Sequence, residues 1–238
     1  MQSALRIIYP ARCMTCGDLV ETDFALCGPC WRDTPFIAGL VCNACGAPLM
    51  GHDDDPNVLC DDCMAVERPW SRGRAAMRYA DNGRKMVLGL KHGDRTDIAS
   101  SGSLWMSVAA QPMLQDDTVL VPIPLHWTRL LQRKYNQSAL LAKNVARHLD
   151  RPFLADSLVR TKRTASLGGK TQDQRFDTLA DAIHPHPRRG RKLQGKSVML
   201  VDDVMTSGAT LSAATEAAMQ AGAKDVCVLL LARAAKEA

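Results

Sequence analysis

One stretch decides the fold of this chain: Val198–Thr210, which reads VMLVDDVMTSGAT. Its first four residues are apolar, as in a strand buried within a parallel sheet. The acid pair Asp202 and Asp203 follows near the carboxyl end of that strand, where open α/β sheets bind ligands. The small residues after it form a loop whose backbone N–H groups and hydroxyls can surround a phosphate at a helix N-terminus. Vicinal hydroxyls beside a 5-phosphate, the pattern of a ribose 5-phosphate, fit this arrangement.

The sequence around this stretch predicts a βαβ unit. We expect a strand over 196–204, a helix over 211–220 capped by Gly222, and a strand over 225–232 that contains Cys227. Upstream, apolar patterning predicts strands over 75–79 and 118–122 and helices over 84–91, 98–110 and 138–149. Asn82-Gly83 is typical of a turn, and the basic segment 160–192, which has almost no apolar periodicity, of a long loop.

The other eight cysteines form four Cys-x-x-Cys pairs: Cys13/Cys16, Cys27/Cys30, Cys42/Cys45 and Cys60/Cys63. Two thiolates from one such turn grip a zinc ion, and two pairs complete its tetrahedral shell. Gly17 and Gly46 follow the first and third pairs, which indicates a unit that occurs twice. We therefore expect two structural zinc sites; a reducing compartment disfavours disulfides, and four pairs are too many for one redox centre.

The spacing leaves the pairing open. The repeat favours sequential sites, with Cys13, Cys16, Cys27 and Cys30 around one zinc and Cys42, Cys45, Cys60 and Cys63 around the other. A cross-brace that joins the first pair to the third and the second to the fourth satisfies the same tetrahedral geometry.

Length and charge divide the chain in two. The 238 residues, 46% hydrophobic, are enough for one α/β core and a small second module, which we place at 67–238 and 1–66. Residues 1–66 hold three basic against nine acidic residues, a net charge of 3 − 9 = −6, and the remainder holds 27 against 16, a net of +11. The zinc module is therefore expected to be a scaffold, and the basic part to contact any phosphate or nucleic acid.

If single-stranded DNA is a partner, the basic loop should supply the contacts, namely Arg160, Lys162, Arg163, Lys170 and Arg188 to Lys192. Apolar runs fall short of the roughly 18 residues that a membrane helix needs. The N-terminus lacks the apolar region of a signal peptide. We expect a soluble, cytoplasmic protein that is not an integral membrane protein.

A second candidate element is Val121-Pro122-Ile123-Pro124-Leu125-His126, directly after a buried strand. Arg129 and Arg133 follow it and offer donors suited to phosphate oxygens. Pro-x-Pro after a strand is common, so this element alone is a weak signal.

In this order, the motifs resemble those of the ComF competence family, which includes GntX-like proteins, over nearly the whole chain. The resemblance rests on Pro10 to Gly17, Leu90 to Gly93, the Val-Pro-x-Pro-Leu element, Arg129 to Gln137 and the VMLVDDVMTSGAT run. It implies an α/β fold of the type I phosphoribosyltransferase kind, with a Rossmann-like parallel sheet, preceded by a double zinc ribbon. It also implies a role in natural transformation beside an ATP-driven DNA translocase.

By this resemblance the ligand is phosphoribosyl pyrophosphate with Mg2+. Asp202 and Asp203, also the candidate catalytic residues, would hold the ribose hydroxyls. The 5-phosphate would lie on Met205, Thr206, Ser207, Gly208, Ala209 and Thr210, and the pyrophosphate side would comprise Pro122, Ile123, Pro124, Arg129 and Arg133. The chain departs from the family at Lys134, usually glycine, at Ala165-Ser166-Leu167, and at Thr178.

Two functions of different classes fit these residues. The first is a binding module that senses phosphoribosyl pyrophosphate and supports DNA uptake. The alternative is an active phosphoribosyltransferase that transfers ribose 5-phosphate to a nitrogenous base in nucleotide salvage. The resemblance favours the first.

Overall fold

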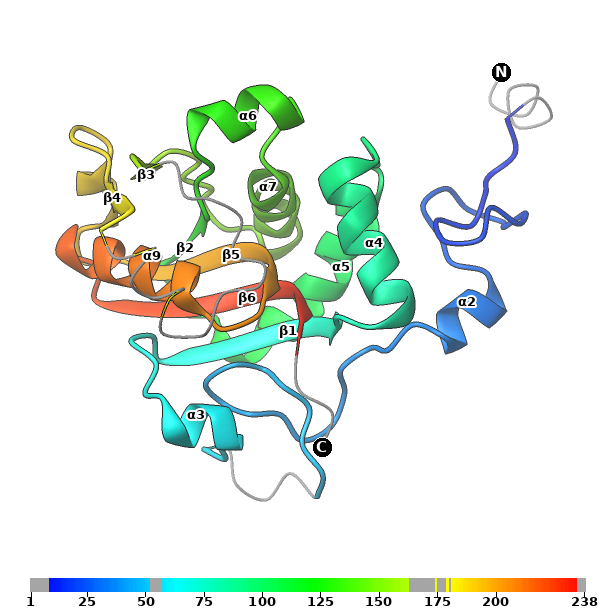
Figure 1. The fold of residues 1–238 in the computed structure, drawn as a ribbon, viewed down its shortest axis with the longest axis horizontal. Coiled ribbons are helices and arrows are strands. Elements are labelled where there is room, and N and C mark those ends of the chain that lie inside the picture. The colour runs from blue at the N-terminus through cyan, green and yellow to red at the C-terminus, as the bar shows by residue number, and fades with distance from the viewer. Residues whose placement is uncertain (1–8, 52–56, 163–173, 175–178, 180, 235–238) are drawn as a thin grey trace.

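A four-stranded parallel sheet forms the centre of the molecule (Figure 1). The computed structural model describes residues 9–51, 57–162, 174, 179 and 181–234. The strands β1 (Arg72–Arg78), β6 (Asp225–Arg233), β5 (Ser197–Met205) and β2 (Thr118–Pro122) lie side by side in that order. All neighbours pair in parallel, as expected for strands that are buried on both faces.

Helices cover one face of this sheet. Here α4 (Asp81–His92), α5 (Ile98–Ala110) and α7 (Gln137–Leu149) pack against the β5 side chains Met199 and Val201 and their neighbours. On the opposite face, α9 (Ala209–Gln220) packs against Val198 and Leu200. The predicted βαβ unit β5–α9–β6 is therefore present, and Gly222 follows α9 in the left-handed conformation.

Shorter elements complete the described chain. They are α6 (Trp127–Arg133), the antiparallel pair β3 (Leu158–Arg160) and β4 (Ile183–Pro185), and the 3-10 helices η1 (Gln111–Met113) and η2 (Gly190–Leu193). Of the segment 160–192, predicted as one long loop, residues 183–185 form β4 and η2 begins at Gly190, while residues 163–173, 175–178 and 180 lie outside the described residues. None of the helices in the described ranges is long and apolar enough to cross a membrane.

The predicted turn at Asn82-Gly83 is wrong. Both residues lie in the first turn of α4 and are buried. A Cβ at Gly83 would lie 2.3 Å from the backbone oxygen of Arg78. Glycine is needed there because the start of α4 passes close to the end of β1, so the Asn-Gly pair reflects tight packing rather than a hairpin.

The cysteine-rich region consists of two similar halves. In each half an antiparallel bridge closes the first turn, Arg12 with Leu19 and Val41 with Pro48. A five-residue helix then starts right after the third cysteine: α2 (Gly28–Arg32) and α3 (Asp61–Ala65). The second Cys-x-x-Cys pair of each half thus uses a helical turn, which explains why no glycine needs to follow it.

The two halves pack on different sides of β1. The first half joins the helical layer, where Asn82 donates to the backbone oxygen of Cys30 at 3.2 Å. The second half lies beneath β1 in Figure 1, and Cys42, Cys45 and Trp70 share a core cluster with Ala75, Val228 and Leu230. The second half therefore acts as a layer of the α/β core, next to α9.

The segment between the halves runs along the outer edge of β1. Phe36 forms an antiparallel bridge with Met77, and the N–H of Ile37 donates to the oxygen of Ala76 at 3.0 Å. This contact covers part of a sheet edge that would otherwise expose unpaired backbone groups.

Gly46 and Gly17 hold equivalent positions in the two halves, both with positive φ, and allow a test of this packing. A Cβ at Gly46 would lie 2.8 Å from the backbone nitrogen of Ala75, whereas one at Gly17 would meet nothing within 4 Å. Gly46→Ala should destabilise the protein by about 3 kcal/mol, from backbone strain plus overpacking, and Gly17→Ala by about 1 kcal/mol, from strain alone. Thermal unfolding of the zinc-loaded variants measures both; equal losses would contradict the docking of the second half on β1.

Candidate functional site

The candidate site lies between the carboxyl ends of β2 and β5. Pro122, the last residue of β2, pairs with Val201, so β5 continues four residues beyond its neighbour. From β2 the chain passes through α7 to Phe153, which bridges Leu120 in parallel, whereas from β5 it passes through α9 to β6. The connections leave in opposite directions, and such a switch point is where open α/β sheets bind ligands.

The acid pair lies on the extended end of β5. Asp202 Oδ1 accepts a hydrogen bond from Ser138 Oγ at 2.8 Å, at the start of α7. Asp203 Oδ1 lies 2.9 Å from Lys91 Nζ, in the last turn of α4. Two helices of the same layer therefore hold the two carboxylates.

Burial and charge act together on Asp202. Loss of solvent, followed in importance by the neighbouring charge of Asp203, raises the pKa of Asp202 to about 7. Ser138 and Lys91 oppose this rise only in part. The site thus holds a carboxyl whose pKa is near neutral. A hydrogen-bond donor or a cation brought by a ligand would stabilise its ionised form.

The phosphate loop, Thr206–Thr210, connects β5 to α9. Gly208 has a φ of 88° and caps the helix, a left-handed conformation that favours glycine. Backbone N–H groups at the start of a twelve-residue helix form an anion-binding arrangement. Thr206 and Thr210 line a cavity of about 320 Å3 together with Asp202 and Asp203.

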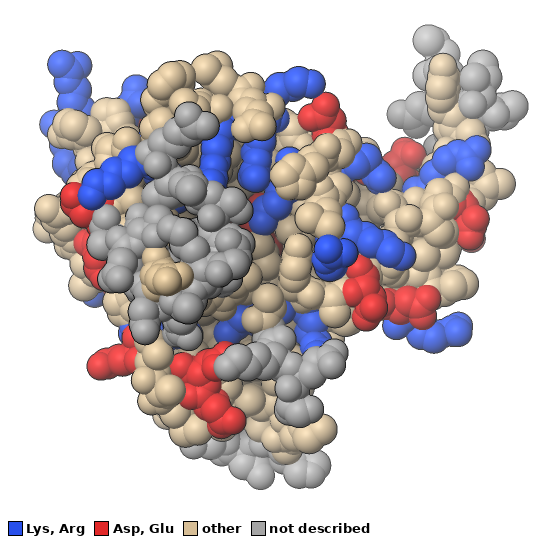
Figure 2. Space-filling model, viewed as in Figure 1, with Lys and Arg blue, Asp and Glu red and all other residues tan. Residues whose placement is uncertain are grey.

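Basic side chains form the opposite wall of this cavity. Arg129 and Arg133 extend from α6, Lys91 from α4 and Arg160 from β3. Desolvation, and next the charge of Arg129, lower the pKa of Arg160 from its ordinary value. Figure 2 shows basic side chains gathered below the position of α6, so the site as a whole favours an anionic ligand.

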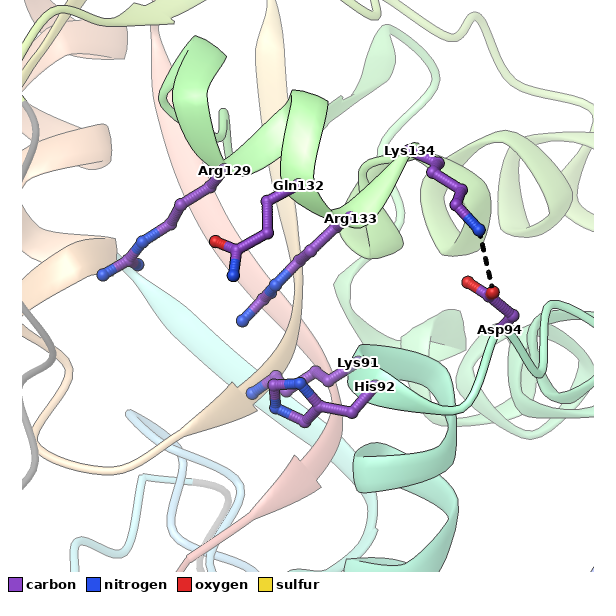
Figure 3. A pocket seen from close by; sticks show the side chains of 7 residues that line it. All are labelled: Lys91, His92, Asp94, Arg129, Gln132, Arg133 and Lys134. Carbon is purple, nitrogen blue, oxygen red and sulfur yellow. Dashed lines mark hydrogen bonds and ion pairs between the residues drawn. The ribbon is translucent and has the colours of Figure 1, made fainter.

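A second cavity of about 580 Å3 adjoins the first and shares Lys91, Arg129 and Arg133 with it. In Figure 3, Gln132 and Arg133 point from α6 toward Lys91 and His92, and Arg129 extends to the left of them. Lys134 points away from the arginines and pairs with Asp94 at 3.2 Å. The two cavities together form a basic groove that is longer than a single phosphate group.

The structure brings together most of the residues expected at this site. Seven of them line the 320 Å3 cavity: Ile123, Arg129, Arg133, Asp202, Asp203, Thr206 and Thr210. Pro122, Pro124, Met205, Ser207, Gly208 and Ala209 do not line it, and the side chain of Met205 is buried in the core.

Sequence reasoning missed Lys91, Ser138 and Arg160 as parts of this wall. Lys91 lies in the Leu-Lys-x-Gly motif, so a signal for it was present. Ser138 follows Asn136, whose side chain caps α7 and donates to the oxygen of Ile123 at 3.0 Å. That contact brings the start of α7 to the strand end, which spacing alone does not indicate.

The cysteine sulfurs form two clusters of four, Cys13, Cys16, Cys27 and Cys30, and Cys42, Cys45, Cys60 and Cys63, each with all sulfurs within 4.8 Å of one another. This is the sequential arrangement. Sulfurs of Cys16 and Cys27, and of Cys45 and Cys60, lie 3.6 Å apart. A tetrahedral zinc with Zn–S bonds of about 2.3 Å needs about 3.8 Å between sulfurs, so both clusters fit the ion.

The thiols of the second cluster share their protons unequally. Hydrogen bonds from the thiols of Cys45 and Cys63 lower the pKa of Cys42, whereas burial raises the pKa of Cys60 to about 11. Zinc binding requires deprotonated cysteines, so it must release these protons.

Comparison with known proteins agrees with this architecture. Residues 4–64 match the double zinc ribbon domain family, and residues 136–238 match the phosphoribosyl transferase domain family. The DNA utilization protein YhgH of Escherichia coli is 29% identical over 233 residues, 95% of this chain and 99% of that protein. Competence protein F of Haemophilus influenzae is 26% identical over 229 residues, 94% of this chain and 97% of that protein.

The chain therefore resembles the ComF competence proteins over nearly its whole length. A third relative, competence protein ComFC of Bacillus subtilis, is 28% identical over 212 residues, 86% of this chain and 82% of that protein. Among solved structures, a purine phosphoribosyltransferase from Pyrococcus horikoshii matches with a TM-score of 0.35 and 16% identity, over 56% of this chain and 70% of that one. The two family matches and the strand order identify a phosphoribosyltransferase-like α/β fold with an N-terminal double zinc ribbon.

The raised pKa of Asp202 predicts how stability depends on pH. The folded state binds this proton more tightly than the unfolded chain, so the group stabilises the fold below its unfolded pKa, and this contribution is lost as the pH rises through about 7. Asp202→Asn, which cannot ionise, should therefore stabilise the protein more at pH 8.5 than at pH 5.5, by about 2 kcal/mol, because wild-type stability falls by about 1.4 kcal/mol per pH unit until the pH reaches about 7. Denaturant unfolding at both pH values measures this, with the exposed Glu216→Gln as control. An equal effect of Asp202→Asn at both would refute the assignment.

Proposed function

We propose that the chain binds phosphoribosyl pyrophosphate in the crevice between β2 and β5. One observation carries the proposal: an acid pair and a glycine-capped helix N-terminus lie on the two sides of a single loop and share one cavity. The carboxylates accept hydrogen bonds from the ribose 2- and 3-hydroxyls, while the phosphate loop receives the 5-phosphate.

The basic groove accommodates the remaining charge of the ligand. Lys91, Arg129 and Arg133 border both cavities, so a pyrophosphate attached to C1 of the ribose would meet cations from two different helices. Carboxylate and phosphate oxygens are the ligands that Mg2+ prefers, and Asp202 and Asp203 supply the protein's share. When bound, Mg2+ would neutralise pyrophosphate charge.

We further propose that this binding site acts in DNA uptake, with single-stranded DNA and a DNA translocase as partners. The support is the relatives' names, which speak of competence and DNA utilization, and the net charge of +11 over residues 67–238. Four exposed basic residues lie in or beside η2: Arg188, Arg189, Arg191 and Lys192. Lys162, two residues after the end of β3, is also exposed. Arg160, by contrast, borders the ligand cavity, and Arg163 and Lys170 lie outside the described residues.

Binding of phosphoribosyl pyrophosphate with Mg2+ should depend on the acid pair. The double substitution Asp202→Asn and Asp203→Asn removes the charged acceptors and should weaken binding by on the order of 2 kcal/mol, about thirtyfold. Calorimetry measures this, with Asp116→Asn, exposed and before β2, as the matched control. Unchanged affinity in the double variant would exclude the site.

A separate assay distinguishes the two candidate functions. Release of pyrophosphate by the wild-type protein with one of a panel of bases would identify a transferase rather than a binding module.

DNA binding should follow the basic part of the chain. Removing the exposed charges of Arg188, Arg189, Arg191 and Lys192 should weaken the affinity for single-stranded oligonucleotides, because each phosphate contact releases counterions. The log-log salt slope should become less negative by about 0.7 per lost contact. Fluorescence titration of the full chain at two salt concentrations measures both quantities. Neutralising the charges of Asp61 and Asp62 in α3 serves as the control. A salt slope that stays unchanged when the four basic residues around η2 are neutralised would rule out this surface for DNA binding.

A further inference from the structure

The second zinc cluster and the phosphate loop are joined by one buried arginine. Arg68 follows the last cysteine of that cluster by five residues and is 9% exposed. Its Nε donates to Cys63 Sγ at 3.5 Å, and its Nη1 donates to the backbone oxygen of Ser207 at 2.7 Å. The guanidinium also lies 5.7 Å from the centre of the Trp70 ring. One rigid fork therefore contacts a zinc ligand and the phosphate loop at the same time.

We propose that Arg68 is a positioning residue through which the second zinc site fixes the phosphate loop for its ligand. This inference rests on the proposed ribose-phosphate site. It assigns a task to the second zinc half beyond holding its own segment together. The first half, on the other side of β1, has no share in that task.

Charge explains why the arginine stays in place. Four thiolates around one zinc ion leave a net charge of about −2. Cys42 and Cys45 are fully buried and Cys63 nearly so, and a buried charge needs a partner of opposite sign. Arg68 is the cation that donates directly to this cluster among the described contacts.

The contact with Ser207 fixes the orientation of one peptide group. In a trans peptide the carbonyl and the following N–H point in opposite directions. Since the Ser207 oxygen faces Arg68, the N–H of Gly208 faces away from the zinc half. Gly208 is the N-cap of α9, so the same contact sets the start of the helix whose N-terminus would receive the phosphate.

Packing makes the arrangement tight. A Cβ at Gly208 would lie 2.8 Å from Met205, 3.0 Å from Arg68 Nη1 and 3.1 Å from the Trp70 ring. Trp70 in turn donates through Nε1 to the oxygen of Ala44, between two cysteines of the cluster, at 2.6 Å. The loop thus rests on side chains that the zinc half anchors at two points.

The test compares two arginines that each join a zinc half to the rest of the molecule. Arg68→Met keeps the aliphatic stem against Trp70 and removes both hydrogen bonds. Arg95→Met is the matched control, since Arg95 donates to the oxygen of Met14 in the first half at 3.2 Å and lies away from the phosphate loop. Metal analysis of each full-length variant should give two zinc ions per chain. Should Arg68→Met lose zinc, Arg68→Lys, which keeps the charge beside Cys63 without the fork, replaces it.

Two readouts separate positioning from a general loss of structure. Amide hydrogen exchange of residues 207–210 should be faster in Arg68→Met and unchanged in Arg95→Met. Calorimetry should show about tenfold weaker binding of ribose 5-phosphate by Arg68→Met, with pyrophosphate binding unaffected. Wild-type exchange rates and affinity in Arg68→Met would overturn the proposal. If the wild-type protein binds no ribose 5-phosphate, the proposed function fails, while the exchange experiment still decides the role of Arg68.

The zinc itself can be tested in the same way. Cys16→Ser and Cys60→Ser each remove one ligand, from the first and the second cluster. Only Cys60→Ser should speed exchange in the phosphate loop and weaken ribose 5-phosphate binding. Equal effects of the two variants would show that the second site has no special link to the loop.

Discussion

The candidate site depends on the way β5 extends past β2. The parallel register ends at Pro122 and Val201, and the next residues of β5 are the two aspartates, which therefore have strand conformation without a β2 neighbour. β6 still pairs with β5 on the other side and keeps this extension straight. Ser138 and Lys91 then fill the space beside the carboxylates. Strand pairing thus fixes the acid pair before any ligand binds.

Positively charged side chains and a helix N-terminus surround this end of β5. Cations come from α4 in the helical layer and from the short helix α6, while α9 contributes a helix N-terminus. The second zinc half completes the layer on the α9 side, where another α/β protein would use a helix. Its cluster carries the negative charge that holds Arg68. In this account a metal site more than a hundred residues away in sequence belongs to the architecture of the phosphate loop.

The sequence predicted most helices and strands because the patterns that determine them lie within short stretches of the chain. The run Val198–Thr210 combines a buried strand with a small-residue loop, and the cysteine spacing indicated the repeated halves. Asn82-Gly83 misled because a glycine required by packing between α4 and β1 resembles a turn glycine. The sequence did not predict the contacts of Ser138 and Lys91 with the acid pair, or of Arg68 with the phosphate loop. Each of these contacts joins segments that only the fold brings together. Lys134, a position where the resemblance implies glycine, has a φ of 67° at the end of α6, a left-handed conformation that favours glycine.

The proposed ligand is a ribose 5-phosphate that spans the acid pair and the phosphate loop. The most direct measurement is a crystal structure of the protein with phosphoribosyl pyrophosphate and Mg2+. We expect the 5-phosphate on residues 206–210, the ribose hydroxyls within hydrogen-bond distance of Asp202 and Asp203, and the pyrophosphate toward Lys91, Arg129 and Arg133. A ligand bound with its 5-phosphate away from this loop, or a crevice that stays empty at saturating ligand, would contradict the account.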